Sequence, residues 1–213
     1  MNDQARGTVG QSGETALERY YRFHAPVYDL TRWTFLFGRS GILRKVAAKG
    51  SPCRILEVGC GTGRNLAELG RLFPSARITG LDRSLDMLER AKKRINPMGG
   101  RIELVRQGYN GPIFPSSNFD LVLFSYSLTM FNPGFEVAIE AASRELAPDG
   151  RVAVVDFHDS TCPGFERWMG LNHVRVNGQL RPILREHFAP LHDELRQAYG
   201  GIWRYLLFLG RKS

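Results

Sequence analysis

The fold is decided by the stretch RILEVGCGTG, residues 54–63, a short apolar run that leads into three closely spaced glycines. Such a run is typical of a buried parallel strand, and the glycines permit a tight turn at which a ligand lies against bare backbone. A helical pattern follows over 65–73, and the N-terminus of a helix favours a carboxylate or phosphate group. The stretch therefore predicts a strand, a turn and a helix, with a ligand at the turn.

Outward from this stretch, short apolar strands alternate with helices. We expect strands at 54–58, 77–81, 102–106, 120–125 and 152–157, and helices at 65–73, 85–95 and 135–146. Strands that alternate with helices need crossover connections, so this part is predicted to be a single doubly wound, mostly parallel α/β sheet covered on both faces. Beyond residue 158 the expected elements are helices near 164–171 and 181–198, the second split at Pro190, and a strand over 203–209.

Length and composition indicate a soluble globular chain. Its 213 residues are 43% hydrophobic, and no run of 18 apolar residues is present. That length suits one domain with a core of its own, and no segment is apolar enough to span a bilayer. Three cysteines without framework spacing, and a polar start without an apolar signal core, are expected of a cytoplasmic protein.

The chain divides into three regions of different amino-acid composition. We expect a flexible tail over 1–15, a helical lid or substrate segment over 16–49 that is rich in aromatic residues and arginine, and the sheet domain over 50–213. The chain carries a formal net charge of +8 with a pI near 9.8. Such a charge favours nucleic acid, anionic lipid or a phosphorylated substrate, or it serves solubility alone.

The glycine turn is not that of the common nucleotide sites. A dinucleotide fingerprint needs a glycine three residues after Gly61, where this chain has Arg64, and no Gly-Lys-Ser/Thr of a P-loop follows. An acidic residue, Glu57, lies two positions before the first glycine. Asp82 closes the second strand, where a carboxylate is placed to accept hydrogen bonds from ribose hydroxyls.

Taken together, the glycine turn, Asp82 and the alternating strands resemble the class I S-adenosylmethionine-dependent methyltransferases over roughly residues 50–160. The resemblance implies the Rossmann-like fold of that family, with an N-terminal helical lid, and S-adenosyl-L-methionine as cofactor. It implies that Asp82 holds the ribose, that Glu57 orients the site, and that Arg83 and Met87 flank the adenine. The full set of cofactor-binding residues so expected is Glu57, Gly59, Cys60, Gly61, Gly63, Asn65, Asp82, Arg83, Met87, Gly108, Tyr109 and Ser125.

One loop departs from the family pattern. After the third strand the family often shows Gly-Asp-Ala, whose aspartate contacts the adenine amino group, whereas this chain has Gly108-Tyr109-Asn110. Gln107, the amide of Asn110 or a backbone carbonyl are the alternatives for that contact.

The loop after the fourth strand, 125–130, borders the substrate in this family and reads SYSLTM. It lacks the Asn/Asp-Pro-Pro-aromatic motif of adenine methyltransferases, no cysteine nucleophile is available for pyrimidines, and no acidic cluster suggests a metal site. Nucleic acid is therefore disfavoured as the substrate. The segments 27–32, 35–39, 60–66, 125–130, 154–157 and 173–174 resemble the bacterial N-methyltransferases of betaine-lipid synthesis and related phospholipid N-methyltransferases.

This second resemblance implies methylation of the amine of a lipid headgroup; a small-molecule N- or O-methyltransferase and a non-catalytic cofactor-binding module are the alternatives. An alkylamine with a pKa of roughly 10 must lose its proton, which desolvation and a nearby base promote. Expected catalytic residues are Tyr126, His158 and Tyr28, and expected substrate-binding residues are Tyr20, Tyr21, Arg32, Arg39 and Asp156. For most of these aromatic residues, simple packing on the sheet is the competing interpretation.

The segment before residue 50 also bears on the partner. Its arginines and aromatic residues suit peripheral binding to an anionic membrane face, with rings in the interface and cations at the headgroups. A lid folded over the cofactor is the other interpretation, and the two are compatible.

Overall fold

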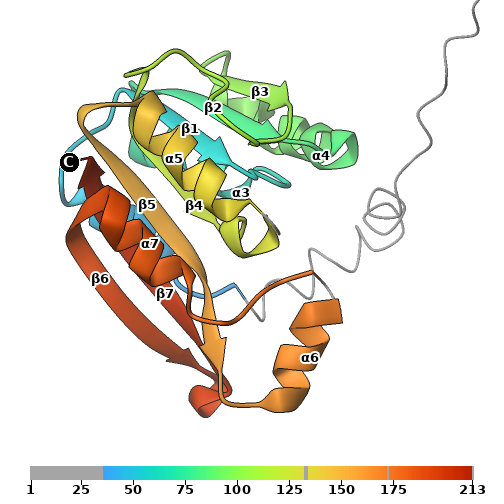
Figure 1. Cartoon of the computed structure of the whole chain (residues 1–213). Helices are drawn as coiled ribbons and strands as arrows, with labels where there is room; N and C mark the ends of the chain where they lie inside the picture. The colour runs from blue at the N-terminus through green and yellow to red at the C-terminus, as the bar shows by residue number, and fades with distance from the viewer. Residues whose placement is uncertain (1–35, 132–133, 172, 213) are drawn as a thin grey trace, which may run out of the picture. The chain divides into compact units, whose positions relative to one another are not determined.

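The computed structural model describes residues 36–131, 134–171 and 173–212 (Figure 1). The tail expected over 1–15 and the part of the expected lid before residue 36 lie outside these residues. No helix in the described part of the chain is long and apolar enough to cross a membrane.

A seven-stranded sheet organises the domain, in the order β3-β2-β1-β4-β5-β7-β6. Neighbouring strands from β3 to β5 are parallel, and β7 is antiparallel to both β5 and β6. The strands are β1 Arg54–Val58, β2 Arg77–Asp82, β3 Ile102–Arg106, β4 Phe119–Ser125, β5 Leu146–Ser160, β6 Phe188–Ala198 and β7 Trp203–Lys212. The predicted α/β doubly wound, mostly parallel sheet is confirmed.

Helices cover both faces of this sheet. In Figure 1, α5 and α7 lie in front of the strands, and they pack on a core of side chains from β1, β4, β5 and β7. On the other face, α3 contacts α2 and α4. The helices are α2 Arg39–Ala47, α3 Arg64–Leu72, α4 Leu85–Ile95, α5 Phe135–Glu145, α6 Pro163–Leu171 and α7 Leu180–His187, with short 3-10 turns η1 Asn96–Met98, η2 Leu128–Met130 and η3 Tyr199–Gly201.

The helix that follows β2 begins as its sequence predicts. Ser84 has extended backbone geometry, and its Oγ accepts a hydrogen bond from the backbone N–H of Met87 over 3.4 Å. Met87, Leu88, Ala91 and Ile95 form the buried face of α4. A capped N-terminus and an apolar stripe at helical spacing therefore fix this helix beside the loop after β1.

The prediction of a helix over 181–198 is wrong beyond residue 187. Helix α7 ends at His187, and 188–198 form β6, the edge strand, which pairs antiparallel with β7. The apolar residues of this strand are spaced as on one face of a helix, whereas in the sheet the hydrogen bonds to β7 decide the conformation. Pro190 coincides with a register shift in that pairing, as expected of proline on an edge strand.

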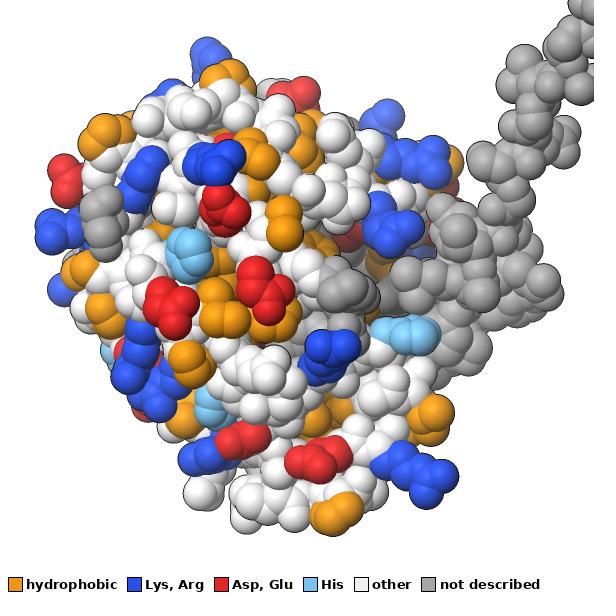
Figure 2. Space-filling view, in the orientation of Figure 1, with side chains coloured by type: hydrophobic (Ala, Val, Ile, Leu, Met, Phe, Trp, Pro, Cys, Tyr) orange, Lys and Arg blue, Asp and Glu red, His pale blue; other side chains and the backbone are white. Residues whose placement is uncertain are grey.

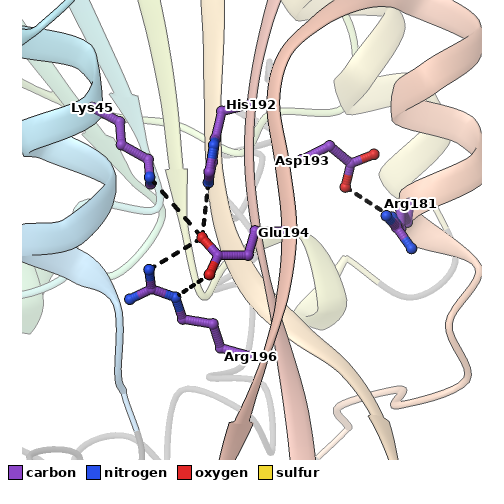
Figure 3. A network of polar contacts seen from close by, with 6 residues as sticks. All are labelled: Lys45, Arg181, His192, Asp193, Glu194 and Arg196. Atoms are coloured by element: carbon purple, nitrogen blue, oxygen red, sulfur yellow. Dashed lines mark hydrogen bonds and ion pairs between the residues drawn. The ribbon is translucent and has the colours of Figure 1, made fainter.

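Ion pairs hold the exposed side of β6 (Figure 3). Glu194 lies 2.7 Å from Arg196 Nε, 3.0 Å from His192 Nε2 and 4.0 Å from Lys45 Nζ on α2. On the opposite side of the strand, Asp193 accepts from Arg181 Nε on α7 over 2.8 Å. Charged groups at a sheet edge discourage pairing with another strand, so the edge is protected as well as anchored.

The residues just before β1 belong with the sheet. Helix α2, which falls at the end of the segment expected to form the lid, contacts β5 and β7. Its N-cap, Gly38, has φ +80°, and a Cβ there would lie 2.6 Å from Cε2 of Tyr205 on β7. Only glycine permits this close approach, which places α2 directly over the sheet.

Candidate functional site

The glycine loop after β1 is folded tightly against β2. The backbone N–H groups of Gly59 and Cys60 both donate to the carbonyl of Leu81, over 2.8 and 3.0 Å. All three glycines of the loop have positive φ: +73° at Gly59, +53° at Gly61 and +74° at Gly63. Because L side chains rarely adopt this conformation, the sequence has glycine where the loop turns.

Gly63 also lets the start of α3 lie close to α4. A Cβ at this position would lie 2.9 Å from the Cβ of Ala91 on α4, closer than real contacts allow. On the same loop, Arg94 Nη1 donates to the carbonyl of Thr62 over 3.1 Å and to its Oγ1 over 2.9 Å. The sequence carries no signal for this contact, because the two residues are 32 positions apart in the chain.

Asp82 joins the glycine loop to the end of β2. Its Oδ2 accepts the backbone N–H of Gly61 over 2.8 Å, and its Oδ1 accepts that of Ser84 over 2.9 Å. The carboxylate is half-buried, at the C-terminal edge of the sheet. Each carboxylate oxygen carries two lone pairs, so Asp82 keeps the capacity to accept ligand hydroxyls.

Glu57 and Asn65 form a buried polar pair behind the loop. Asn65 Nδ2 donates to Glu57 Oε1 over 2.7 Å. Glu57 Oε2 and Asn65 Oδ1 are buried and have no hydrogen-bond partner among the described residues. Burial raises the pKa of Glu57 to about 8, against the lowering effects of Asn65 and the positive charge of Arg39. Two buried acceptors without donors fit a ligand that brings a cationic or N–H group to this point.

The loops after β1 and β4 meet where the strand order reverses. Ser127 Oγ donates to the carbonyl of Val58 over 2.9 Å, and a Cβ at Gly59 would lie 2.7 Å from the Cβ of Ser127. Ser125, at the end of β4, is buried, and its Oγ has no hydrogen-bond partner among the described residues. Open α/β sheets bind ligands at this topological switch point, outside the carboxyl ends of the strands.

Some of the residues expected around the adenine are exposed and others are buried. Arg83 and Gly108 are exposed, and Met87 is buried on α4. Tyr109 lies in the core, where its OH donates to Glu145 Oε2 over 2.6 Å. The phenol is therefore held by the core, and contact with a cofactor at position 109 is left to the backbone.

Glu145 was not singled out from the sequence. It is fully buried at the end of α5, and its Oε1 accepts the backbone N–H groups of Ile113 and Phe114 over 2.5 and 2.7 Å. With the bond from Tyr109, this carboxylate fixes the whole connection between β3 and β4. A charged residue at a helix end gives no sequence signal for such a role.

Tyr126 is held from two sides. Its backbone has φ +56°, and its OH donates to the carbonyl of Phe37 over 2.8 Å. The guanidinium of Arg39 lies 5.8 Å from the centre of its ring. Burial and the nearby Asp156 raise the pKa of Tyr126 well above its ordinary value. The phenol is thus neutral and donates to backbone, so it positions the loop after β4 and is poorly suited to accept a proton.

Asp156 is also engaged within the protein. It is fully buried on β5, and it accepts from Thr129 Oγ1 over 2.5 Å and from the backbone N–H of Phe157 over 2.8 Å. Burial raises its pKa to about 6. The carboxylate therefore faces η2 and fixes the start of the connection to α5.

His158 lies one residue further along β5 and lines a cavity of about 10 Å³, room for roughly one water molecule. Its ring is buried, Nδ1 has no hydrogen-bond partner among the described residues, and Nε2 is 3.8 Å from Asp159 Oδ2. Burial lowers the pKa of His158, so the imidazole is neutral near pH 7. Thr129, Arg175 and Asn177 line the same cavity.

The structure therefore brings Glu57, the three glycines, Asn65, Asp82 and Ser125 to one edge of the sheet, with Tyr126 and Arg39 beside them. Four further expected residues lie outside the described part of the chain: Tyr20, Tyr21, Tyr28 and Arg32.

The sheet order, the glycine loop and the acid that ends β2 define the class I methyltransferase fold. Residues 55–150 match the family model described as a methyltransferase domain. In structure, the chain is similar to the N-methyltransferase NodS from Bradyrhizobium japonicum in complex with S-adenosyl-L-homocysteine, with a TM-score of 0.69 and 21% identity, over 82% of this chain and 85% of that one.

In sequence, the chain is similar to two curated proteins. It is 30% identical over 144 residues to the ubiquinone/menaquinone biosynthesis C-methyltransferase UbiE of Syntrophotalea carbinolica, a match that covers 65% of this chain and 60% of that protein. It is 37% identical over 103 residues to the fatty-acid O-methyltransferase of Mycolicibacterium smegmatis, which covers 48% of this chain and 36% of that protein. The chain thus spans less than two thirds of the length of these relatives.

Proposed function

We propose that this protein is an S-adenosyl-L-methionine-dependent methyltransferase. The observation that carries the proposal is the hydrogen bond from Gly61 to Asp82, which sets a carboxylate against a glycine loop at the switch point of the sheet. The match of residues 55–150 to a methyltransferase domain supports the same assignment.

The residues present fit this cofactor. S-adenosyl-L-methionine, when bound, supplies a methyl group on a positively charged sulfonium. Asp82 has lone pairs for the ribose hydroxyls, and the buried acceptors Glu57 Oε2 and Asn65 Oδ1 suit the ammonium group of the methionyl part. The backbone of the glycine loop lets the ligand approach without side-chain obstruction. The protein's own contribution is then alignment of the reactants and exclusion of water.

We further propose an amine of a lipid headgroup as the methyl acceptor. The segments that resemble lipid N-methyltransferases support it, and so does His158, which is neutral, buried and able to accept the proton that an ammonium group must lose. The similar proteins act on carbon, oxygen and nitrogen atoms by their names, so a small-molecule N- or O-methyltransferase is the second candidate.

Transfer of a labelled methyl group tests both the methyltransferase activity and the proposed lipid acceptor. The purified protein is incubated with methyl-labelled cofactor and either a bacterial lipid extract or a panel of soluble amines, phenols and quinols, and products are identified by mass spectrometry. Label in a lipid amine supports the full proposal. Label only in soluble compounds supports the second candidate, and cofactor binding without any transfer supports a non-catalytic binding module.

The location of the protein is part of the same proposal. A cytoplasmic enzyme that acts on lipid has to reach an anionic membrane face, and the net charge of +8 favours this contact. Flotation with vesicles tests it: equal recovery with neutral and anionic vesicles at low and high salt would contradict it.

A further inference from the structure

Glu57 differs from the other buried carboxylates of the described residues in its hydrogen bonds. Figure 2 shows acidic side chains at the surface, where water solvates their charge, whereas Glu57, Glu145 and Asp156 are each at most 1% exposed. Glu145 and Asp156 each accept three hydrogen bonds from hydroxyl and backbone N–H groups. Glu57 accepts one, from Asn65 Nδ2 over 2.7 Å, and its Oε2 has no partner among the described residues. Glu57 is therefore the buried carboxylate whose negative charge receives the fewest hydrogen bonds.

The charged and titratable groups around Glu57 do not offset its burial. Burying an ionised carboxylate without donors is costly, and such a group keeps its proton instead. Among the described residues, the groups that act on Glu57 are Arg39 on α2, which favours the ionised form, and Asp82 on β2, which disfavours it. Burial raises the pKa of the neighbouring Cys60 thiol well above its ordinary value, so the thiol is uncharged. Burial also has the largest effect on Glu57, and it raises the pKa of this carboxyl to about 8.

An ammonium group supplies the kind of donor that this pair can accept. Glu57 Oε2 and Asn65 Oδ1 are both buried acceptors, and both belong to the pair behind the glycine loop. We propose that Glu57 is a carboxylic acid in the free protein and releases its proton to the solvent when the ammonium group of the cofactor binds. This inference rests on the proposed function, in which that ammonium group lies beside the pair. The bound ammonium group brings N–H donors and a positive charge, and both favour the carboxylate.

Binding of the cofactor is then linked to pH, and the sign follows from the proton. The ligand binds the ionised form of Glu57, so below a pH of about 8 binding expels a proton and a rise in pH favours it. We expect the association constant to rise about tenfold from pH 6 to 7 and to level off above about pH 8. Between pH 6 and 7 the amine and the carboxylate of the ligand keep their own charges.

The proton on Glu57 also makes the site selective. A nucleoside without the amino-acid part brings no cation to Glu57, so it leaves the carboxylic acid protonated. A ligand with an ammonium group gains the attraction of the carboxylate, because its charge lowers the pKa of Glu57. The site therefore distinguishes the cofactor from other adenosine derivatives, and it loses the cofactor as the medium becomes acidic.

Calorimetry of the whole protein in two buffers of different ionisation enthalpy counts the protons released on binding. S-adenosylhomocysteine carries the ammonium group, and methylthioadenosine has the same nucleoside and a thioether without the amino-acid part. At pH 7 we expect nearly one proton released per bound S-adenosylhomocysteine and none per bound methylthioadenosine. Between pH 6 and 7 the affinity for methylthioadenosine should change less than about twofold.

Two variants assign the proton to Glu57. In Glu57→Gln, S-adenosylhomocysteine should bind without proton release, and its affinity should change less than about twofold between pH 6 and 7. Glu140→Gln is the matched control, the same chemical change at an exposed carboxylate on α5, and it should behave as the wild type does. Infrared difference spectra of the wild type give a readout that does not depend on either variant. The C=O band of a protonated carboxylic acid should disappear when S-adenosylhomocysteine is added.

The outcomes separate this inference from the proposed function. A wild-type protein that binds neither ligand would refute the proposed function, and this inference with it. Three results would overturn the inference alone and leave the cofactor site in place: binding of S-adenosylhomocysteine without proton release, equal release with methylthioadenosine, or release retained in Glu57→Gln. A carboxylic-acid band that is unchanged on binding would overturn it as well.

Discussion

Gly61 donates its backbone N–H to Asp82 Oδ2 over 2.8 Å, a bond that joins the loop after β1 to the end of β2. The two residues are 21 positions apart in the chain and meet because parallel neighbouring strands end at the same edge of the sheet. The bond fixes the glycine loop and the carboxylate relative to one another.

Asp82→Asn should therefore weaken the binding of S-adenosylhomocysteine at least tenfold, about 1.4 kcal/mol. The amide keeps the size of the side chain but removes the charge and one acceptor. Isothermal titration calorimetry measures the effect. Asp149→Asn, the same chemical change at an exposed position of β5, is the control and should bind as the wild type does. An unchanged dissociation constant in Asp82→Asn would remove Asp82 from the site.

Gly63→Ala should destabilise the fold by about 1–3 kcal/mol. The position has φ 74° and ψ 21°, and the new methyl would lie 2.9 Å from the Cβ of Ala91. Gly200 has nearly the same backbone, φ 67° and ψ 17°, with no atom within 4 Å of an added Cβ. Gly200→Ala thus reports the conformational cost alone. Urea denaturation of both variants should give the larger loss for Gly63→Ala, and equal losses would contradict a close approach of α3 and α4.

Glu57 should make the protein less stable as pH rises. Burial raises its pKa to about 8, so between pH 4.5 and 8 the unfolded chain releases a proton that the folded protein retains. The free energy of unfolding falls through that window by this contribution and then levels off. In Glu57→Gln the fall should be smaller, as measured by denaturation at pH 5.5 and 8.5. The same variant should bind the cofactor more weakly, because the amide cannot take up the negative charge that a bound ammonium group would stabilise on Glu57. Identical pH slopes in both proteins would contradict the burial effect.

Glu145→Ala should cost about 3 kcal/mol or more of the free energy of unfolding. It leaves the hydroxyl of Tyr109 and the N–H groups of Ile113 and Phe114 without their acceptor. Glu140→Ala on the same helix removes only an exposed pair with Arg144 and should cost less than about 0.5 kcal/mol. Chemical denaturation compares the two, and similar costs would show that Glu145 does not organise the loop after β3.

The parallel half of the sheet could be predicted from the sequence because its strands are short apolar runs bounded by glycine, proline and charge. The structure has a strand at each of the five positions expected before residue 158. The late strand β6 was mistaken for a helix, since its polar residues and Pro190 carry no period-2 pattern, and its conformation depends on pairing with β7. The residue pattern of β6 alone does not show that β7, which comes later in the chain, pairs with it.

Some residues of the candidate site could likewise be predicted from the sequence, and others could not. The glycines and Asp82 could be found because a tight turn and a strand end restrict which residues occur there. The contacts of Tyr126 with Phe37 and of Arg94 with Thr62 join residues 89 and 32 positions apart, and only the folded chain brings them together. For the same reason Glu145 could not be recognised from the sequence as the residue that fixes the loop after β3.

A crystal structure of the protein with S-adenosylhomocysteine would show whether the glycine loop and Asp82 form the cofactor site. We expect density for the nucleoside against the backbone of residues 59–63, with the ribose hydroxyls within hydrogen-bond distance of Asp82 and the amino group beside Glu57. A ligand bound elsewhere on the chain, or a crevice that takes a dinucleotide and leaves S-adenosylhomocysteine unbound, would contradict it.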